Sequence, residues 1–183
     1  MSLWGTSPIG KDMYRKSIEE LRDRAVELGA GESKVIEVST VKTASWVRYK
    51  CQFGCDGYGE CWTCPPHSPA PEETQKILNS FQKAILIHCK SGSKVDISKV
   101  VLQVEKEAFF AGYHKALGMG AGPCRLCREC NLKGECRHRE KARPSMEACG
   151  IDVFTTARNN GFTIDTLDSA KCKADYFGIV LIE

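Results

Sequence analysis

Four cysteines between positions 124 and 136 constrain this chain more than any other feature. Cys124, Cys127, Cys130 and Cys136 have the spacing C-x2-C-x2-C-x5-C. Three thiols at intervals of three residues form a compact set of soft ligands, and a bacterial [4Fe-4S] ferredoxin site begins with the same C-x2-C-x2-C run. The fourth cysteine departs from the ferredoxin pattern, because it follows after five residues and Arg137 stands where that pattern has proline. We therefore expect a metal here, and the triplet favours an iron–sulfur cluster.

Structural zinc is the competing interpretation of this quartet, which is the second of two along the chain and is called the second quartet below. Zinc sites usually take two C-x2-4-C pairs that are separated by a longer finger. A third cysteine only three residues after the second fits that arrangement less well. The spacing favours a [4Fe-4S] cluster and leaves zinc as the alternative cofactor.

A first quartet lies upstream with the spacing C-x3-C-x5-C-x2-C. Its members are Cys51, Cys55, Cys61 and Cys64, and it runs directly into Pro65 and Pro66. Glycines in this loop allow the backbone to wrap closely around a cofactor and to point amide hydrogens at its sulfurs. We expect two cysteine-rich metal loops, 51–66 and 124–150, which together hold one or two clusters.

Cysteine content also bears on the compartment. Eleven cysteines in 183 residues require either a disulfide scaffold or metal binding. Disulfides need an oxidising compartment, but residues 1–10 have neither the basic start nor the apolar run of a signal peptide. No stretch approaches the 18 apolar residues of a membrane span. We expect a cytoplasmic protein with reduced, metal-binding cysteines and no membrane partner.

Charge is unevenly distributed, although the net charge is only +3. Between Cys124 and Pro144 there are three acidic residues and seven basic ones, namely Arg125, Arg128, Lys133, Arg137, Arg139, Lys141 and Arg143. Thiolate-ligated clusters are anionic, and nearby cations offset that charge. No aromatic residue lies in this segment for bases to stack on, so a nucleic-acid partner is not favoured.

The periodicity of apolar residues predicts a single domain, 1–183, of the α+β class: a mixed sheet with packed helices. Helices are expected from Tyr14 to Gly29, from Pro71 to Phe81 and from Asp96 to Gly118, with helical turns at 144–147 and 151–158. Strands are expected at 35–38, 46–49, 84–87, 163–167 and 176–182, the last being apolar enough to lie centrally. The strand at 46–49 would deliver the chain to Cys51.

Two isolated features are expected to be structural. Cys89 and Cys172 each stand alone near an apolar strand, so we expect neither to bind metal.

A glycine run precedes the second quartet. Gly118, Gly120 and Gly122 form a G-x-G-x-G run, but it follows a helix and leads into Cys124. The dinucleotide motif follows a strand and opens a helix, so we expect tight backbone packing here and no nucleotide.

Several short motifs carry a resemblance that covers most of the chain. They are Cys51-Gln-Phe-Gly-Cys55, Tyr58-Gly59, Trp62-Thr-Cys64-Pro65-Pro66, the second quartet, Arg143-Pro-Ser-Met-Glu-Ala and Gly150-Ile-Asp-Val153. In these stretches the chain resembles the metal-binding family named domain of unknown function 2284. The resemblance implies a cytoplasmic metal-binding protein with Cys51, Cys55 and Cys64 as ligands. It does not imply a role for Cys61, which the spacing favours, so the fourth ligand of the first site stays open.

The sequence leaves three functions to weigh. The first is a redox module, with one or two [4Fe-4S] clusters that pass single electrons to a redox partner protein. The second is a zinc-stapled scaffold or adaptor, and the third is a cluster-dependent reductase or activase. No H-E-x-x-H, G-x-S-x-G or Walker motif is present, so the sequence assigns no catalytic residue.

Overall fold

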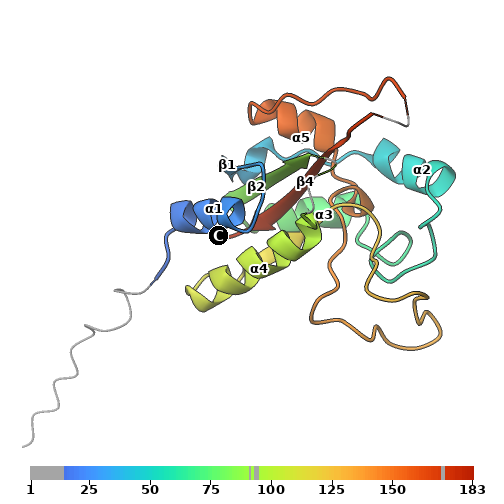
Figure 1. Ribbon diagram of the computed structural model, residues 1–183. Coiled ribbons are helices and arrows are strands. Elements are labelled where there is room, and N and C mark those ends of the chain that lie inside the picture. The colour runs from blue at the N-terminus through green and yellow to red at the C-terminus, as the bar shows by residue number, and fades with distance from the viewer. Residues whose placement is uncertain (1–14, 91, 93–94, 170–171) are drawn as a thin grey trace, which may run out of the picture.

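The computed structural model describes residues 15–90, 92, 95–169 and 172–183, which form an α+β fold (Figure 1). One sheet has the strand order β1-β2-β4-β3, and every neighbouring pair is antiparallel. The strands are β1 Glu32–Glu37, β2 Lys83–Lys90, β3 Leu117–Met119 and β4 Asp175–Leu181. The helices are α1 Ile18–Glu27, α2 Ser45–Gly54, α3 Pro71–Leu78, α4 Ile97–Phe110 and α5 Val153–Asn159, with short 3-10 helices η2 Val38–Thr40 and η3 Glu147–Cys149. The predicted α+β class is confirmed, and these strand pairs make the sheet antiparallel rather than mixed.

The two central strands are buried on both faces, because helices cover each side of the sheet. Successive side chains of a strand point to opposite faces. In β2, Leu86 joins the core that includes α5 and η3, while Ile85 and Ile87 join the core beneath α1 and α4. β4 alternates in the same way and lies between β2 and β3, which confirms that the last predicted strand is central.

Helix ends follow the expected capping chemistry. Ser17 and Glu20 form a capping box at the start of α1, and Asp96 accepts a hydrogen bond from the Ser98 amide at the start of α4. Gly29 has φ +103° just beyond α1, a conformation that glycine adopts without strain, so the predicted end is confirmed. The predicted start at Tyr14 lies outside the described residues. No helix in the described part of the chain is long and apolar enough to cross a membrane.

The predicted strand at 46–49 is wrong, because these residues lie in α2. Helical spacing places Trp46, Tyr49 and Phe53 on the exposed side of α2 and buries Val47 on the other. The rings of Tyr49 and Phe53 are 4.7 Å apart, as residues four positions apart on a helix allow. Aromatic residues favour strands by propensity, and here the packing of α2 against η3 overrides that preference.

Two further boundaries differ from expectation. Residues 163–167 form no strand: the side chain of Ile164 is buried, but its carbonyl accepts hydrogen bonds from the Arg158 side chain instead of a neighbouring strand. α4 ends at Phe110, not at Gly118, and the residues around Gly118 form β3. A β-carbon on Gly118 would lie 2.7 Å from Val101 Cγ1, and one on Gly120 would lie 2.5 Å from Ser98 Oγ, which confirms the expected tight packing at these two glycines. Nothing lies within 4 Å of a β-carbon on Gly122, so the expectation is wrong there.

Candidate metal centre

The two cysteine loops lie side by side at one end of the molecule, next to α2 and α3 (Figure 1). The indole Nε1 of Trp62, in the first loop, donates a 3.0 Å hydrogen bond to the carbonyl of Asn131, in the second. A methyl group on Gly57 would lie 3.4 Å from Pro123 Cβ, so these two residues are also neighbours. Segments more than sixty positions apart therefore share one region.

Cys61 and Cys64 form a close, buried thiol pair. Their Sγ atoms are 3.4 Å apart, within hydrogen-bond reach. Burial, reinforced by the hydrogen bond and charge of Cys61, raises the pKa of Cys64 to about 12. Two neighbouring thiols that resist ionisation become favourable thiolates once a cation lies between them. The pair therefore suits a metal.

Cys55 lies at the exposed end of the first quartet, next to Cys64. The amide of Gly57 donates to Cys55 Sγ over 3.4 Å. A β-carbon on Gly57 would lie 3.5 Å from Cys55 Sγ and 3.6 Å from Cys64 Sγ. Both thiols therefore border the space beside Gly57.

Cys51 lies within α2 and not at the end of a strand, which corrects the expected start of the first loop. Its thiol is half-buried and donates a long, 3.9 Å contact to the carbonyl of Glu147 in η3. Burial raises the pKa of Cys51, and the charge of Cys55 adds to that effect. Cys55 follows one helical turn later, so these two thiols are neighbours across the end of α2.

The second quartet lies on an irregular loop, and each of its four cysteines is half-buried. Local hydrogen bonds shape this loop: the Leu132 amide donates to the Cys130 carbonyl over 3.0 Å, and the Asn131 side chain donates to the Glu135 carbonyl over 3.2 Å. The thiols therefore lie near the surface.

A partly buried ion pair anchors the end of this loop to α4. Arg143 Nε lies 2.7 Å from Glu105 Oε2, and Arg143 Nη2 lies 2.9 Å from Glu105 Oε1. Such a two-point contact between guanidinium and carboxylate fixes orientation as well as distance. The loop is thereby tied to the helix that supports the sheet.

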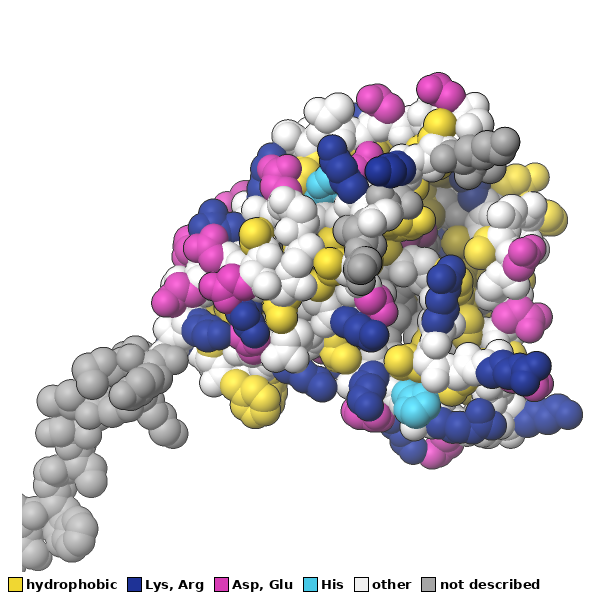
Figure 2. Space-filling model, viewed as in Figure 1, with side chains coloured by type: hydrophobic (Ala, Val, Ile, Leu, Met, Phe, Trp, Pro, Cys, Tyr) yellow, Lys and Arg dark blue, Asp and Glu magenta, His cyan; other side chains and the backbone are white. Residues whose placement is uncertain are grey.

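Six of the seven basic side chains of the second loop are exposed, and Arg143 is the exception. Arg139 pairs with Glu135, and Lys141 lies 3.9 Å from Glu140. Figure 2 shows lysine and arginine side chains gathered at the lower right, in the part of the view where Figure 1 places this loop. The surface beside the second quartet is therefore positively charged.

In the described residues, no three His, Cys, Asp or Glu side chains converge closely enough to hold a metal ion without movement. The donors nevertheless fit a thiophilic centre, because all eleven cysteines are free and the eight predicted ligands lie in two adjacent loops. Metal binding in such sites draws ligands together and contributes to folding. Cys51, Cys55, Cys61, Cys64, Cys124, Cys127, Cys130 and Cys136 therefore remain the predicted ligands.

A family model described as "Predicted metal-binding protein (DUF2284)" matches residues 34–182. The chain belongs to this DUF2284 family. No curated protein and no solved structure matches the chain significantly. The match begins in β1, beyond α1, and covers both cysteine loops together with the sheet that carries them.

Three residues around the DUF2284 cysteine loops have roles that sequence reasoning missed. Arg48 Nη1 donates to the carbonyl of Ala148 over 2.6 Å and to Ser68 Oγ over 2.9 Å, so it joins α2, η3 and the end of the first loop. Cys149 is fully buried, and burial raises its pKa to about 12. Glu147 has a buried Oε2 without a hydrogen-bond partner in the described structure, and burial raises the pKa of this carboxyl. Glu147 stands in the Arg143-Pro-Ser-Met-Glu-Ala motif, and this was the one sequence signal for any of the three.

The two isolated cysteines lie outside both loops in the sequence. Cys89 is buried in the core beneath α1 and α4, and Cys172 is exposed.

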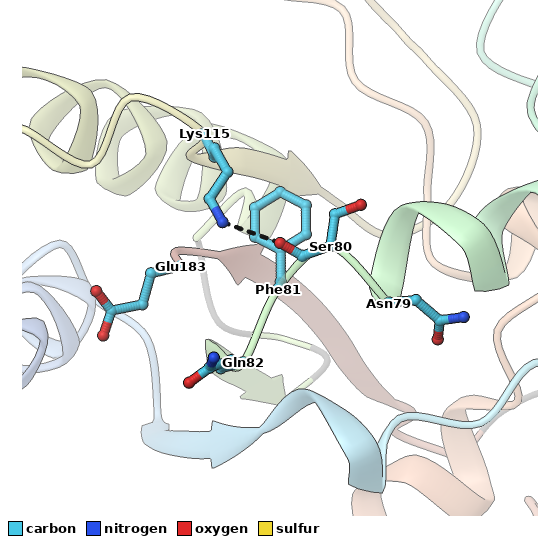
Figure 3. A pocket seen from close by; sticks show the side chains of 6 residues that line it. All are labelled: Asn79, Ser80, Phe81, Gln82, Lys115 and Glu183. Carbon is cyan, nitrogen blue, oxygen red and sulfur yellow. Dashed lines mark hydrogen bonds between the residues drawn. The ribbon is translucent and has the colours of Figure 1, made fainter.

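A surface pocket of about 360 Å³ has no cysteine in its lining (Figure 3). Within it, Lys115 Nζ donates to the Ser80 carbonyl over 2.9 Å, next to Phe81 and Glu183. The pocket therefore shares no residue with the eight predicted ligands of the candidate metal centre.

Proposed function

We propose that this protein is an iron–sulfur redox protein, in which one or two [4Fe-4S] clusters on the two cysteine loops exchange single electrons with a partner protein. The observation that supports it most is the adjacency of two loops, each with four thiols, one of which has the C-x2-C-x2-C run. Reduced thiols of this kind fit the reducing conditions of a cytoplasm.

The protein groups around the thiols would tune the centre. A bound cluster supplies a site that gains or loses one electron. The Gly57 amide donates to Cys55 Sγ, and hydrogen bonds to cluster sulfurs stabilise the reduced form. Exposed cations such as Arg125 and Arg128 offset the negative charge of a thiolate-ligated cluster. Both features therefore favour reduction.

The position of the second quartet suits exchange with a protein. Its cysteines are half-buried, so a partner could approach closely while the cofactor remains partly shielded. The positive surface of the loop complements a partner with an acidic face. We therefore propose an acidic redox protein as the partner.

Zinc remains the second candidate, and one observation favours it. Cys61 and Cys64 form a buried C-x2-C pair of the kind that structural zinc uses. The loops around them have little regular secondary structure, so a zinc ion would serve to hold them in place. In that case the protein would be a zinc-stapled scaffold or adaptor.

Metal analysis distinguishes these functions. Protein purified anaerobically from iron-rich medium should absorb visible light and contain about four iron and four acid-labile sulfide atoms for each cluster. The spectrum should bleach on reduction with dithionite. Cys172→Ser is the matched control, because this exposed thiol lies outside both loops. Stoichiometric zinc without sulfide would support the scaffold instead.

A further inference from the structure

We propose that the two cysteine loops build one composite centre, in which Cys124 of the second loop completes the ligand set of Cys55, Cys61 and Cys64, while Cys51 stays outside it. This inference rests on one part of the proposed function, namely that cysteine thiolates of these loops bind a metal, and it does not depend on the redox role. It differs from the assignment by spacing, which gives each loop its own four ligands.

The first argument is the contact at Gly57. A β-carbon at this position would touch Cys55 Sγ, Cys64 Sγ and Pro123 Cβ at 3.5, 3.6 and 3.4 Å. The two thiols and the proline therefore surround the same small space. Cys124 directly follows Pro123, so the second loop brings its first thiol to the edge of the first quartet.

The second argument is the position of Cys61. Its Sγ lies 3.4 Å from that of Cys64, so these thiols belong to one site. Trp62 stands between Cys61 and Cys64 in the sequence, and its indole Nε1 donates a 3.0 Å hydrogen bond to the Asn131 carbonyl, so the second loop lies against the segment that carries this pair.

The third argument is the direction of Cys51. Its thiol contacts the carbonyl of Glu147 on the η3 side over 3.9 Å. It also lies within the regular helix α2, whose backbone is held by helical hydrogen bonds. Cys124, by contrast, lies in a loop that has no helical hydrogen bonds.

The Trp62 hydrogen bond to Asn131 holds the loops in this arrangement. Trp62 lies between the paired thiols Cys61 and Cys64, and Asn131 directly follows Cys130. The contact therefore fixes the first site against the second loop. Cys127, Cys130 and Cys136 remain as a separate group of three thiols.

A background variant isolates the composite centre. Replacing Cys127, Cys130 and Cys136 by serine removes the three remaining thiols of the second loop and leaves Cys51, Cys55, Cys61, Cys64 and Cys124. This background should retain one metal centre. Adding Cys124→Ser should remove most of its metal, whereas adding Cys51→Ser should leave it nearly unchanged. Iron, sulfide and zinc per chain are measured together with the visible spectrum.

Loss of the remaining metal with Cys51→Ser, or its retention with Cys124→Ser, would overturn the composite centre. These outcomes are distinct from failure of the proposed function. A wild-type protein with zinc instead of iron and sulfide refutes the redox function, yet the same dependence on Cys124 would still support the composite site.

A measurement on metal-free wild-type protein covers the case in which the background variant does not fold. A short bifunctional thiol reagent, followed by peptide mass spectrometry under anaerobic conditions, reports which thiols are neighbours. Cross-links between Cys61 and Cys124 are expected. Cross-links confined to pairs within each loop would contradict the proposal.

Discussion

At the scale of single residues, Cys61 is where spacing and family resemblance disagree. Its buried thiol lies 3.4 Å from Cys64 Sγ, which supports the role that spacing favours. We expect Cys61→Ser to remove one centre's worth of metal, while Cys172→Ser leaves metal content unchanged. Metal analysis and visible spectroscopy of both variants measure this. A Cys61→Ser protein with the iron content and spectrum of the wild type would show that another group is the ligand.

Arg48 is a second residue whose role is visible only in the folded structure. Its guanidinium donates to the Ala148 carbonyl and to Ser68 Oγ, and it thereby holds α2 against η3. Hydrogen bonds from a charged donor contribute about 1.5–3 kcal/mol each, so Arg48→Ala should lower the free energy of unfolding by at least about 2 kcal/mol. Lys50→Ala, at an exposed position of α2, should change it by less than about 0.5 kcal/mol.

Chemical denaturation of the metal-free proteins measures this difference. Equal unfolding free energies for Arg48→Ala and Lys50→Ala would mean that α2 is held by its apolar contacts alone.

At the scale of elements, Glu107 joins α4 to α1 and to the residues just before it. Burial alone would favour the neutral acid, but hydrogen bonds from Lys16, Gln103 and Arg24 outweigh it and lower the pKa of Glu107 to about 2. The ionised form is thus more stable in the folded state than in the unfolded state, where the pKa is near 4.5. This contribution is complete above about pH 4.5 and is lost as the pH falls toward 2.

Glu107→Gln should therefore destabilise the protein by an amount on the order of 2 kcal/mol at pH 7 and by little at pH 2. Thermal unfolding of the wild type and the variant across this range measures the difference. A difference that does not shrink as the pH falls would mean that Glu107 acts through packing and not through its charge.

The pair between Arg143 and Glu105 is the corresponding link between α4 and the second cysteine loop. Glu105 is buried, and removal of its charge leaves the guanidinium without its partner. We expect Glu105→Gln to lower stability by about 1–3 kcal/mol and to weaken metal retention by the loop. Glu135→Gln is the matched control, because its pair with Arg139 is exposed and such pairs contribute less than about 1 kcal/mol. Similar unfolding midpoints and metal content in the two variants would contradict the anchor.

At the scale of the whole molecule, the two central strands of the sheet were the most predictable part. β2 and β4 are continuous apolar runs, and helices on both faces of the sheet explain why these strands need no polar side. Ser17, Asp96 and Gly29 mark helix ends through local chemistry that a sequence displays directly. The prediction of a strand at 46–49 was wrong because it relied on aromatic residues. Trp46, Tyr49 and Phe53 are exposed on α2, and their exposure depends on what packs against the other side of the helix.

The candidate site was predictable only in part. The spacing identifies the cysteines, but it cannot tell which thiols of different loops meet, since that depends on contacts such as Gly57 with Pro123. Cys149 and Glu147 acquire their burial from the packing of η3, to which no local pattern points. Local signals therefore predict the candidate ligands, while tertiary contacts decide which of them lie together.

The charge distribution leads to a last prediction, which concerns the partner and belongs to the proposed redox function. The exposed cations of the second loop should steer an acidic electron carrier toward the half-buried thiols. The rate of electron transfer to an acidic ferredoxin-type protein should fall as salt rises, because a Debye length of roughly 10 Å at 0.1 M shrinks to about 3 Å at 1 M. Arg128→Glu should lower the low-salt rate roughly three- to tenfold and should match the wild type at high salt. Lys76→Glu makes the same charge change on α3 and should have little effect. A rate that does not depend on salt, or an equal loss in both variants, would place the docking surface elsewhere.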